Sequence, residues 1–170
     1  NIQNYKFYLY DRLENGESRE RVNVAENLQN GTFSIEHIMP QTLSKDWISD
    51  LGESHEAIQE KWLNSIANLT LTAYNSNYSN RKFAEKRDMK NGFKDSGFRM
   101  NSFVNKQDTW GEAQLVQRER ILEKQFLELW PLANSNFEWP VTEQEERTLS
   151  DDFDFSGRQI TAFSFMGTTY

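Results

Sequence analysis

Residues 33–41, Phe-Ser-Ile-Glu-His-Ile-Met-Pro-Gln, constrain the fold and function of this chain more than any other stretch. Their apolar residues first alternate with polar ones, as in a half-buried strand, and Pro40 then removes the next backbone donor. Glu36 and His37 are therefore expected where a short strand ends. Because neighbouring strand residues point to opposite faces, the two can act on one point only if the strand breaks up there. Taken alone, the pair fits either a metal and general-base site or a surface glutamate beside a histidine at the core edge.

Three further blocks follow this strand in a fixed order. Residues 68–72 alternate as a second strand, residues 75–80 form an Asn-rich turn, and residues 81–87 have a helical pattern opened by Ser and Asn cap residues. This order resembles the His-Me finger (ββα-metal) nuclease core of the HNH type. More narrowly, the stretches 35–41, 67–71 and 75–86 look like the DUF1524 family, the nuclease domain at the C-terminal side of GmrSD-type, modification-dependent restriction enzymes. The resemblance favours the functional interpretation of the Glu-His pair.

The resemblance implies a role for each polar residue of the first two blocks. His37 would be the general base that activates water, and an imidazole suits this task because it changes its charge near neutral pH. Glu36 would be a metal ligand, at a position where the HNH type carries an Asp or another residue. Asn68 corresponds to the middle Asn of the His-Asn-His/Asn pattern, whose role is to hold the histidine-bearing loop.

The second metal ligand remains open among three asparagines of the third block. Asn77 has the usual HNH offset from Asn68, whereas Asn75 and Asn80 match the DUF1524 pattern more closely. We favour Asn75, then Asn80, and we expect one of the three only to cap the helix. The expected cofactor is Mg²⁺ (or Mn²⁺), because a hard cation with oxygen ligands neutralises a scissile phosphate. With a single carboxylate the site would be weak, and bound DNA would supply further oxygen ligands.

Composition narrows the class of protein. The 170 residues suit one domain with appendages, and aromatics at 14% predict an aromatic-rich core. The absence of cysteine excludes a disulfide scaffold, a Cys-ligated zinc site and a thiol nucleophile, and it agrees with a reducing cytoplasm. No apolar run reaches the length of a membrane span. We therefore expect a cytoplasmic protein without membrane contact, and the resemblance to restriction enzymes implies one of bacterial type.

Charge is distributed unevenly along the chain. The net charge of −7 argues against a nucleic-acid partner, but residues 138–154 hold seven acids against one arginine. Residues 81–106 instead hold eight basic residues against three acids, directly after the candidate site. This local excess matters more for a DNA partner than the total. Arg81, Lys82 and Lys86 are the candidates for phosphate contact, although a solvated helix face explains them nearly as well.

These patterns predict an α+β fold, a mainly helical domain around a small ββα-metal core. Residues 1–30 would form an N-terminal helix (4–13) and a connector, and residues 31–137 the nuclease domain. Within that domain we expect helices near residues 47–51 and 55–67, an aromatic and basic connection over 93–104, and a scaffold helix over 109–130 that Thr109 caps and Glu112 supports. Residues 138–158 would be an acidic linker and residues 159–170 the start of a truncated further domain.

The leading hypothesis is a metal-dependent DNA endonuclease domain of a phage-defence system. The resemblance implies DNA as the partner of the domain, together with an upstream nucleotide-binding or modification-sensing domain. The alternative is a catalytically inactive, nuclease-like module that binds DNA or docks a partner, which the intact Glu36, His37 and Asn68 set argues against. An RNase or a zinc-binding structural domain is disfavoured, because zinc prefers Cys or several His ligands.

Overall fold

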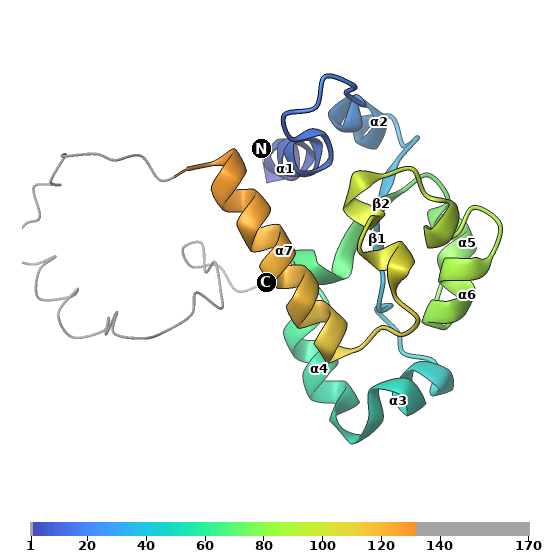
Figure 1. Ribbon diagram of the computed structural model, residues 1–170. Helices are drawn as coiled ribbons and strands as arrows, with labels where there is room; N and C mark the ends of the chain where they lie inside the picture. The colour runs from blue at the N-terminus through green and yellow to red at the C-terminus, as the bar shows by residue number, and fades with distance from the viewer. Residues whose placement is uncertain (1, 132–170) are drawn as a thin grey trace, which may run out of the picture. The chain divides into compact units, whose positions relative to one another are not determined.

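The structure, a computed structural model, describes residues 2–131. It is mainly helical with one small sheet, so the predicted α+β class is confirmed (Figure 1). The helices are α1 (Ile2–Asn15), α2 (Val24–Gln29), α3 (Lys45–Leu51), α4 (His55–Trp62), α5 (Asn75–Tyr78), α6 (Phe83–Asp88) and α7 (Glu112–Leu129). Short 3₁₀ helices are η1 (Gly52–Ser54), η2 (Ile66–Asn68), η3 (Phe93–Asp95), η4 (Arg99–Asn101) and η5 (Val104–Lys106). No helix among residues 2–131 is long and apolar enough to cross a membrane.

The sheet consists of the two strands expected from the alternating pattern. β1 (Ser34–His37) pairs antiparallel with β2 (Leu69–Thr72), and the register places Glu36 opposite Thr70 and His37 opposite Leu69. The last regular pairing thus falls at the histidine. Beyond it, the Ile38 N–H still donates to Asn68 O at 2.9 Å, before Pro40 ends the run.

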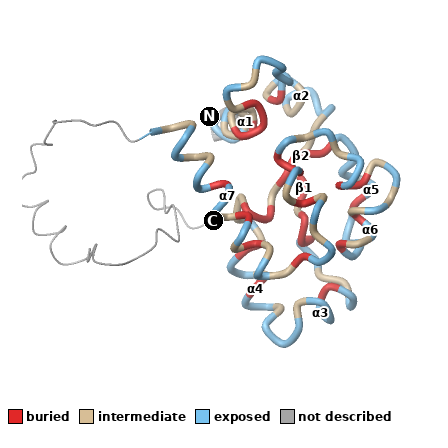
Figure 2. Tube along the Cα trace, in the orientation of Figure 1, coloured by how far each residue is buried: buried red, intermediate tan, exposed pale blue. Residues whose placement is uncertain are grey.

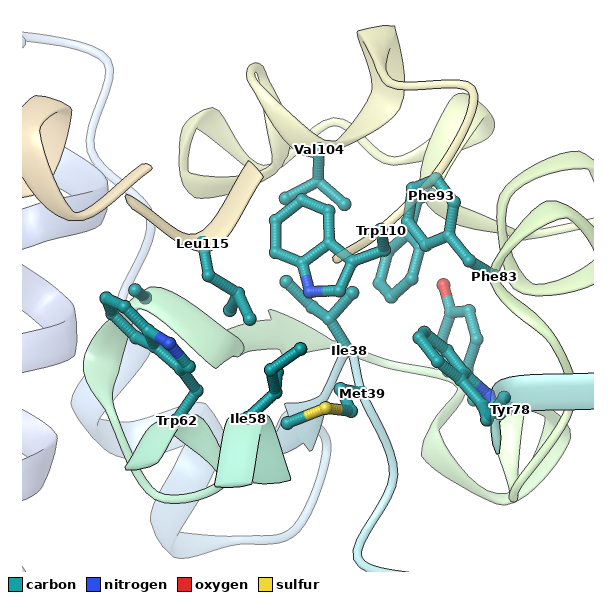
Figure 3. Packing of buried hydrophobic residues seen from close by; sticks show 12 residues of the cluster. Ile38, Met39, Ile58, Trp62, Tyr78, Phe83, Phe93, Val104, Trp110 and Leu115 are labelled. Atoms are coloured by element: carbon teal, nitrogen blue, oxygen red, sulfur yellow. The ribbon is translucent and has the colours of Figure 1, made fainter. Parts of the chain in front are cut away.

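Buried apolar side chains form two clusters, and Figure 2 marks the buried positions along the chain. The larger one is aromatic, as the composition predicts, and brings together residues from β1's end, the helices α3 to α6 and the start of α7 (Figure 3). Tyr78 stacks on Phe93 with ring centroids 4.8 Å apart, and Phe83 stacks on Trp110 at 5.4 Å. Such stacked pairs contribute about 0.5–1.5 kcal/mol each beyond their buried area. Ile38 and Met39 join this cluster, so the residues that follow His37 are anchored in the core.

The smaller cluster unites both ends of the described region. It contains Tyr10 and Leu13 of α1, Leu71 of β2 and Leu122 of α7. The buried Glu14 carboxylate accepts hydrogen bonds from the Arg99 and Met100 backbone N–H groups at 2.8 and 3.0 Å. The N-terminal helix therefore packs on the same unit as the sheet, and the part of the predicted connector before β1 includes one further turn of helix, α2.

The predicted helix starts differ from the structure at two places. α6 begins at Phe83 after Lys82, which makes no side-chain cap, whereas the Asn-rich stretch forms the separate turn α5. α7 begins after Gly111 instead of at Thr109, and the Gln114 side chain accepts a hydrogen bond from the Gly111 N–H at 3.1 Å. The Glu112 carboxylate is used elsewhere, since it accepts hydrogen bonds from Lys61 and the Trp62 indole, each at 3.2 Å. At α7 the tertiary contacts of Glu112 thus replace its predicted capping role, and the Gly111–Gln114 pair caps the helix instead.

The helix predicted over residues 55–67 is interrupted. α4 ends at Trp62, and η2 follows after a turn in which the Ser65 side chain accepts a hydrogen bond from the Ala67 N–H. The aromatic and basic stretch 93–104 is a packed connection of 3₁₀ turns, with Phe93 fully buried. The predicted acidic linker (138–158) and further domain (159–170) lie outside the described residues.

Candidate active site

An open polar cleft of about 610 Å³ lies where β1 ends. It brings together four of the residues singled out in the sequence: Glu36, His37, Asn75 and Asn80. Both members of the Glu-His pair line it, although both still belong to β1, whose regular pairing ends at His37. The remaining wall is formed by Ile35, Pro40, Gln41, Thr42 and Ser79.

His37 is half-buried at the last position of β1. Its Nε2 atom lies 3.3 Å from the side-chain oxygen of Asn64, which follows α4 in the chain. The described residues hold no cluster of three or more His, Asp or Glu side chains that could bind a metal. Among the residues that line the cleft, His37 and Glu36 are the two with ionisable side chains.

Asn68 lies outside the cleft and is fully buried behind it. Its side-chain oxygen accepts a hydrogen bond from the Met39 N–H at 2.8 Å, and its amide donates to Met39 O at 2.9 Å and to Leu63 O at 3.1 Å. One side chain thus binds both polar groups of the second residue after His37. This geometry holds the loop after the histidine, the role that the resemblance implies for Asn68.

The three hydrogen bonds of the Asn68 side chain, here called the Asn68 clamp, are expected to stabilise the fold measurably. Asn68→Ala leaves two buried backbone groups of Met39 and the partly buried Leu63 carbonyl without this partner. We expect the free energy of unfolding in urea, followed by tryptophan fluorescence, to fall by about 2–4 kcal/mol. Asn77→Ala is the matched control, because Asn77 is exposed and surface changes stay within about 0.5 kcal/mol. Equal effects of the two variants would show that the clamp does not hold the loop.

Glu36 is paired with a lysine beneath the cleft. The Lys86 ammonium donates to Glu36 Oε1 at 2.7 Å and also to the main-chain oxygens of His37 at 2.9 Å and Ile38 at 3.2 Å. All three acceptors belong to the end of β1 and the residue after it. The lysine comes from α6, so this contact ties the helix to the histidine-bearing strand end.

Burial opposes the charges of this pair. Burial raises the pKa of Glu36, and the nearby Lys86 charge only partly offsets this shift. Burial likewise lowers the pKa of Lys86, and the Glu36 charge partly offsets that shift. The side chain of Lys86 is 0% exposed. This placement corrects one sequence expectation: Lys86 does not reach a DNA phosphate, because its ammonium is enclosed under the strand end.

The opposite wall of the cleft comes from the turn between α5 and α6. Tyr78 anchors it from below, since its ring is buried and its hydroxyl donates to Asn91 O at 3.0 Å. Ser79 then adopts a positive φ of 47°, an uncommon conformation for a non-glycine residue. Asn75 and Asn80, on either side of these two residues, line the cleft, whereas Asn77 does not. The structure therefore groups the two asparagines favoured from the sequence with Glu36 and His37.

Two exposed basic residues follow this wall in the sequence. Arg81 and Lys82 directly follow Asn80, and both side chains are about half exposed. Each is 3.8–4.0 Å from the Glu85 carboxylate, and surface pairs of this kind are weak. Unlike Lys86, these two side chains are accessible to a phosphate from solvent.

The donor types of the cleft suit a hard cation. The Glu36 carboxylate and the amides of Asn75 and Asn80 supply oxygens, which Mg²⁺ prefers. Only one of these groups is charged, and one of its oxygens already accepts from Lys86. These oxygen donors are therefore of the type that binds a hard cation. Because only one of them is charged, we expect the binding to be weak.

Two cleft-supporting residues carried no signal in the sequence. Gln59 of α4 donates to Pro40 O at 3.3 Å and to Gln41 O at 2.8 Å, which fixes the wall after the histidine. Asn64 contacts His37 from a turn that sequence periodicity assigned to the interior of a helix. Both contacts join segments distant in sequence, so no local pattern reveals them.

The fold and the cleft define a mainly helical α+β domain with a histidine, a carboxylate and amides at the edge of its sheet. A comparison with protein families identifies it further. The profile described as "GmrSD restriction endonucleases, C-terminal domain" matches residues 1–125, and the chain belongs to this family. The family is one of nucleases in restriction systems. No curated protein and no solved structure shows a significant match.

Proposed function

We propose that this chain is a metal-dependent DNA endonuclease domain of the HNH type, acting in a modification-dependent restriction system. The observation that carries the proposal is the accessible His37, which shares an open cleft with Glu36, Asn75 and Asn80. Membership in a restriction endonuclease family supports DNA as the substrate.

In the proposed reaction, His37 takes a proton from a water molecule in the cleft. The water oxygen then attacks the scissile phosphorus, the bond from phosphorus to the 3′ oxygen breaks, and the 3′ oxygen takes up a proton from solvent. Asn68 and Lys86 hold the backbone from the His37 carbonyl to Met39, so the position of the imidazole is set before DNA binds.

Glu36, Asn75 and Asn80 would hold the divalent cation. When bound, it would supply positive charge for the phosphate and the departing oxygen. Arg81 and Lys82 extend the positive charge beside the cleft and are the candidates for backbone contact with DNA.

Removal of the metal tests the proposal. Plasmid cleavage, by this chain alone and with any companion domain of the same protein, is expected with Mg²⁺ or Mn²⁺ and is expected to stop with EDTA. Calorimetry without DNA is expected to show weak Mg²⁺ binding, with a Kd on the order of 1 mM, because the cleft holds one carboxylate already paired with Lys86. Unchanged cleavage in EDTA would contradict metal dependence, and micromolar Mg²⁺ binding would contradict the weak site.

The alternative is a catalytically inactive module that binds DNA or a partner. The pairing of the only cleft carboxylate with Lys86 favours it, because that pairing leaves less negative charge for a cation. DNA binding without cleavage of modified or unmodified plasmid, with either metal and with the companion domain present, would support this alternative.

A further inference from the structure

The contact between His37 and Asn64 joins two segments that are both held by hydrogen bonds to Asn68. Asn64 lies one residue after Leu63, whose carbonyl accepts from Asn68, and the adjacent turn is closed by hydrogen bonds from Leu63 N to Gln59 O and from Ser65 N to Trp62 O. The Asn68 side chain also binds both main-chain groups of Met39, two residues after His37. The same buried amide thus fixes the backbone next to both partners of the contact.

The chemistry of this contact defines the protonation state of the ring. The Asn64 side-chain oxygen lies 3.3 Å from Nε2, and an amide oxygen only accepts, so a hydrogen bond between these two atoms requires the proton on Nε2. In a neutral imidazole the other nitrogen, Nδ1, then keeps its lone pair. A hydrogen bond donated by one ring nitrogen therefore makes the other ring nitrogen the basic one.

We propose that Asn64 is a positioning residue that fixes neutral His37 as the Nε2–H tautomer and makes Nδ1 its basic atom. The role of this atom in activating water rests on the proposed nuclease function, whereas the tautomer does not. Asn64 would act through His37 alone, since it is not among the residues that line the cleft.

The only other histidine of the chain supplies an internal reference. His55 Nδ1 lies 3.0 Å from the Gly52 carbonyl oxygen, which also only accepts. His55 is therefore expected to carry its proton on Nδ1, the opposite tautomer from His37. Two histidines with opposite expected tautomers make their ring signals easy to tell apart.

The test is ¹⁵N NMR of the ring nitrogens at about pH 9, where ordinary imidazoles are neutral. We expect His37 to be protonated at Nε2 in the wild type and in Asn64→Asp, which keeps an acceptor oxygen. In Asn64→Ala we expect an averaged mixture of both tautomers, with the His55 signals unchanged. A wild-type His37 protonated at Nδ1, or ring shifts unaffected by Asn64→Ala, would overturn the proposal.

Cleavage kinetics separate this proposal from the proposed function. Loss of an orienting partner is expected to lower the plasmid cleavage rate on the order of tenfold in Asn64→Ala, with recovery in Asn64→Asp. Full activity of Asn64→Ala would refute the positioning role. A protein that cuts no DNA while His37 shows the expected tautomer would instead refute the nuclease function and leave the assigned tautomer standing.

Discussion

Replacing His37 with alanine is expected to lower the rate of plasmid cleavage by about 10²–10⁴-fold, the range that a positioned general base contributes. The side chain is half-buried at the strand end and lines the open cleft. Its loss removes the one imidazole of the cleft, and no other lining residue has a neutral base suited to pH 7. Cleavage is followed as conversion of supercoiled plasmid with Mg²⁺.

His55→Ala is the matched control for this substitution. His55 lies at the first turn of α4, contacts Gly52 O and does not line the cleft. We expect this variant to cut DNA at the wild-type rate, and we expect His37→Ala to unfold in urea within about 1 kcal/mol of the wild type. Equal cleavage by both histidine variants would place the general base elsewhere.

Replacing Lys86 with methionine is expected to destabilise the fold by about 3–5 kcal/mol at pH 7, because it leaves the Glu36 charge buried without its partner. It also removes the donor to the carbonyls of His37 and Ile38. Urea unfolding followed by tryptophan fluorescence measures this loss. Lys82→Met is the matched control, since Lys82 is exposed on the same segment and is expected to change stability by less than about 0.5 kcal/mol.

The pH dependence of the Lys86→Met effect has a defined sign. Burial already raises the pKa of Glu36, and removal of the opposing lysine raises it further. A carboxyl whose pKa is raised in the fold contributes stability below its unfolded pKa, and this stability is lost as pH rises through the folded pKa. The difference between the wild type and Lys86→Met should therefore shrink as pH falls toward about 4.

The double variant Glu36→Gln/Lys86→Met separates charge from hydrogen bonding. Removing both charges is expected to recover much of the Lys86→Met loss, because replacing a buried pair by neutral groups costs less than breaking it. The unpaired carbonyls of His37 and Ile38 would keep the recovery incomplete. A double variant no more stable than Lys86→Met would show that buried charge is not the cause.

The sequence correctly located the elements whose patterns are local. Alternation predicted β1 and β2, helical spacing predicted α1, α3, α4 and α7, and Pro40 marked the strand end. The Asn-rich block was recognised from its cap residues, yet the structure separates it into α5 and a turn at Ser79 with positive φ. The predicted cap of α7 was wrong because Glu112 binds the distant Trp62, and the capping box forms two residues later, between Gly111 and Gln114.

The sequence alone therefore determined the fold class, the strand carrying Glu36 and His37, and the Asn-rich block from which two asparagines line the same cleft. These features depend on periodicity and motif order within short windows. Only the tertiary structure decided that Lys86 binds Glu36 from 50 positions away, and that Asn64 meets His37 from 27 positions away. The physical reason is burial: whether a lysine faces solvent or an enclosed carboxylate depends on how α6 packs under the sheet, which the residues around Lys86 do not encode by themselves.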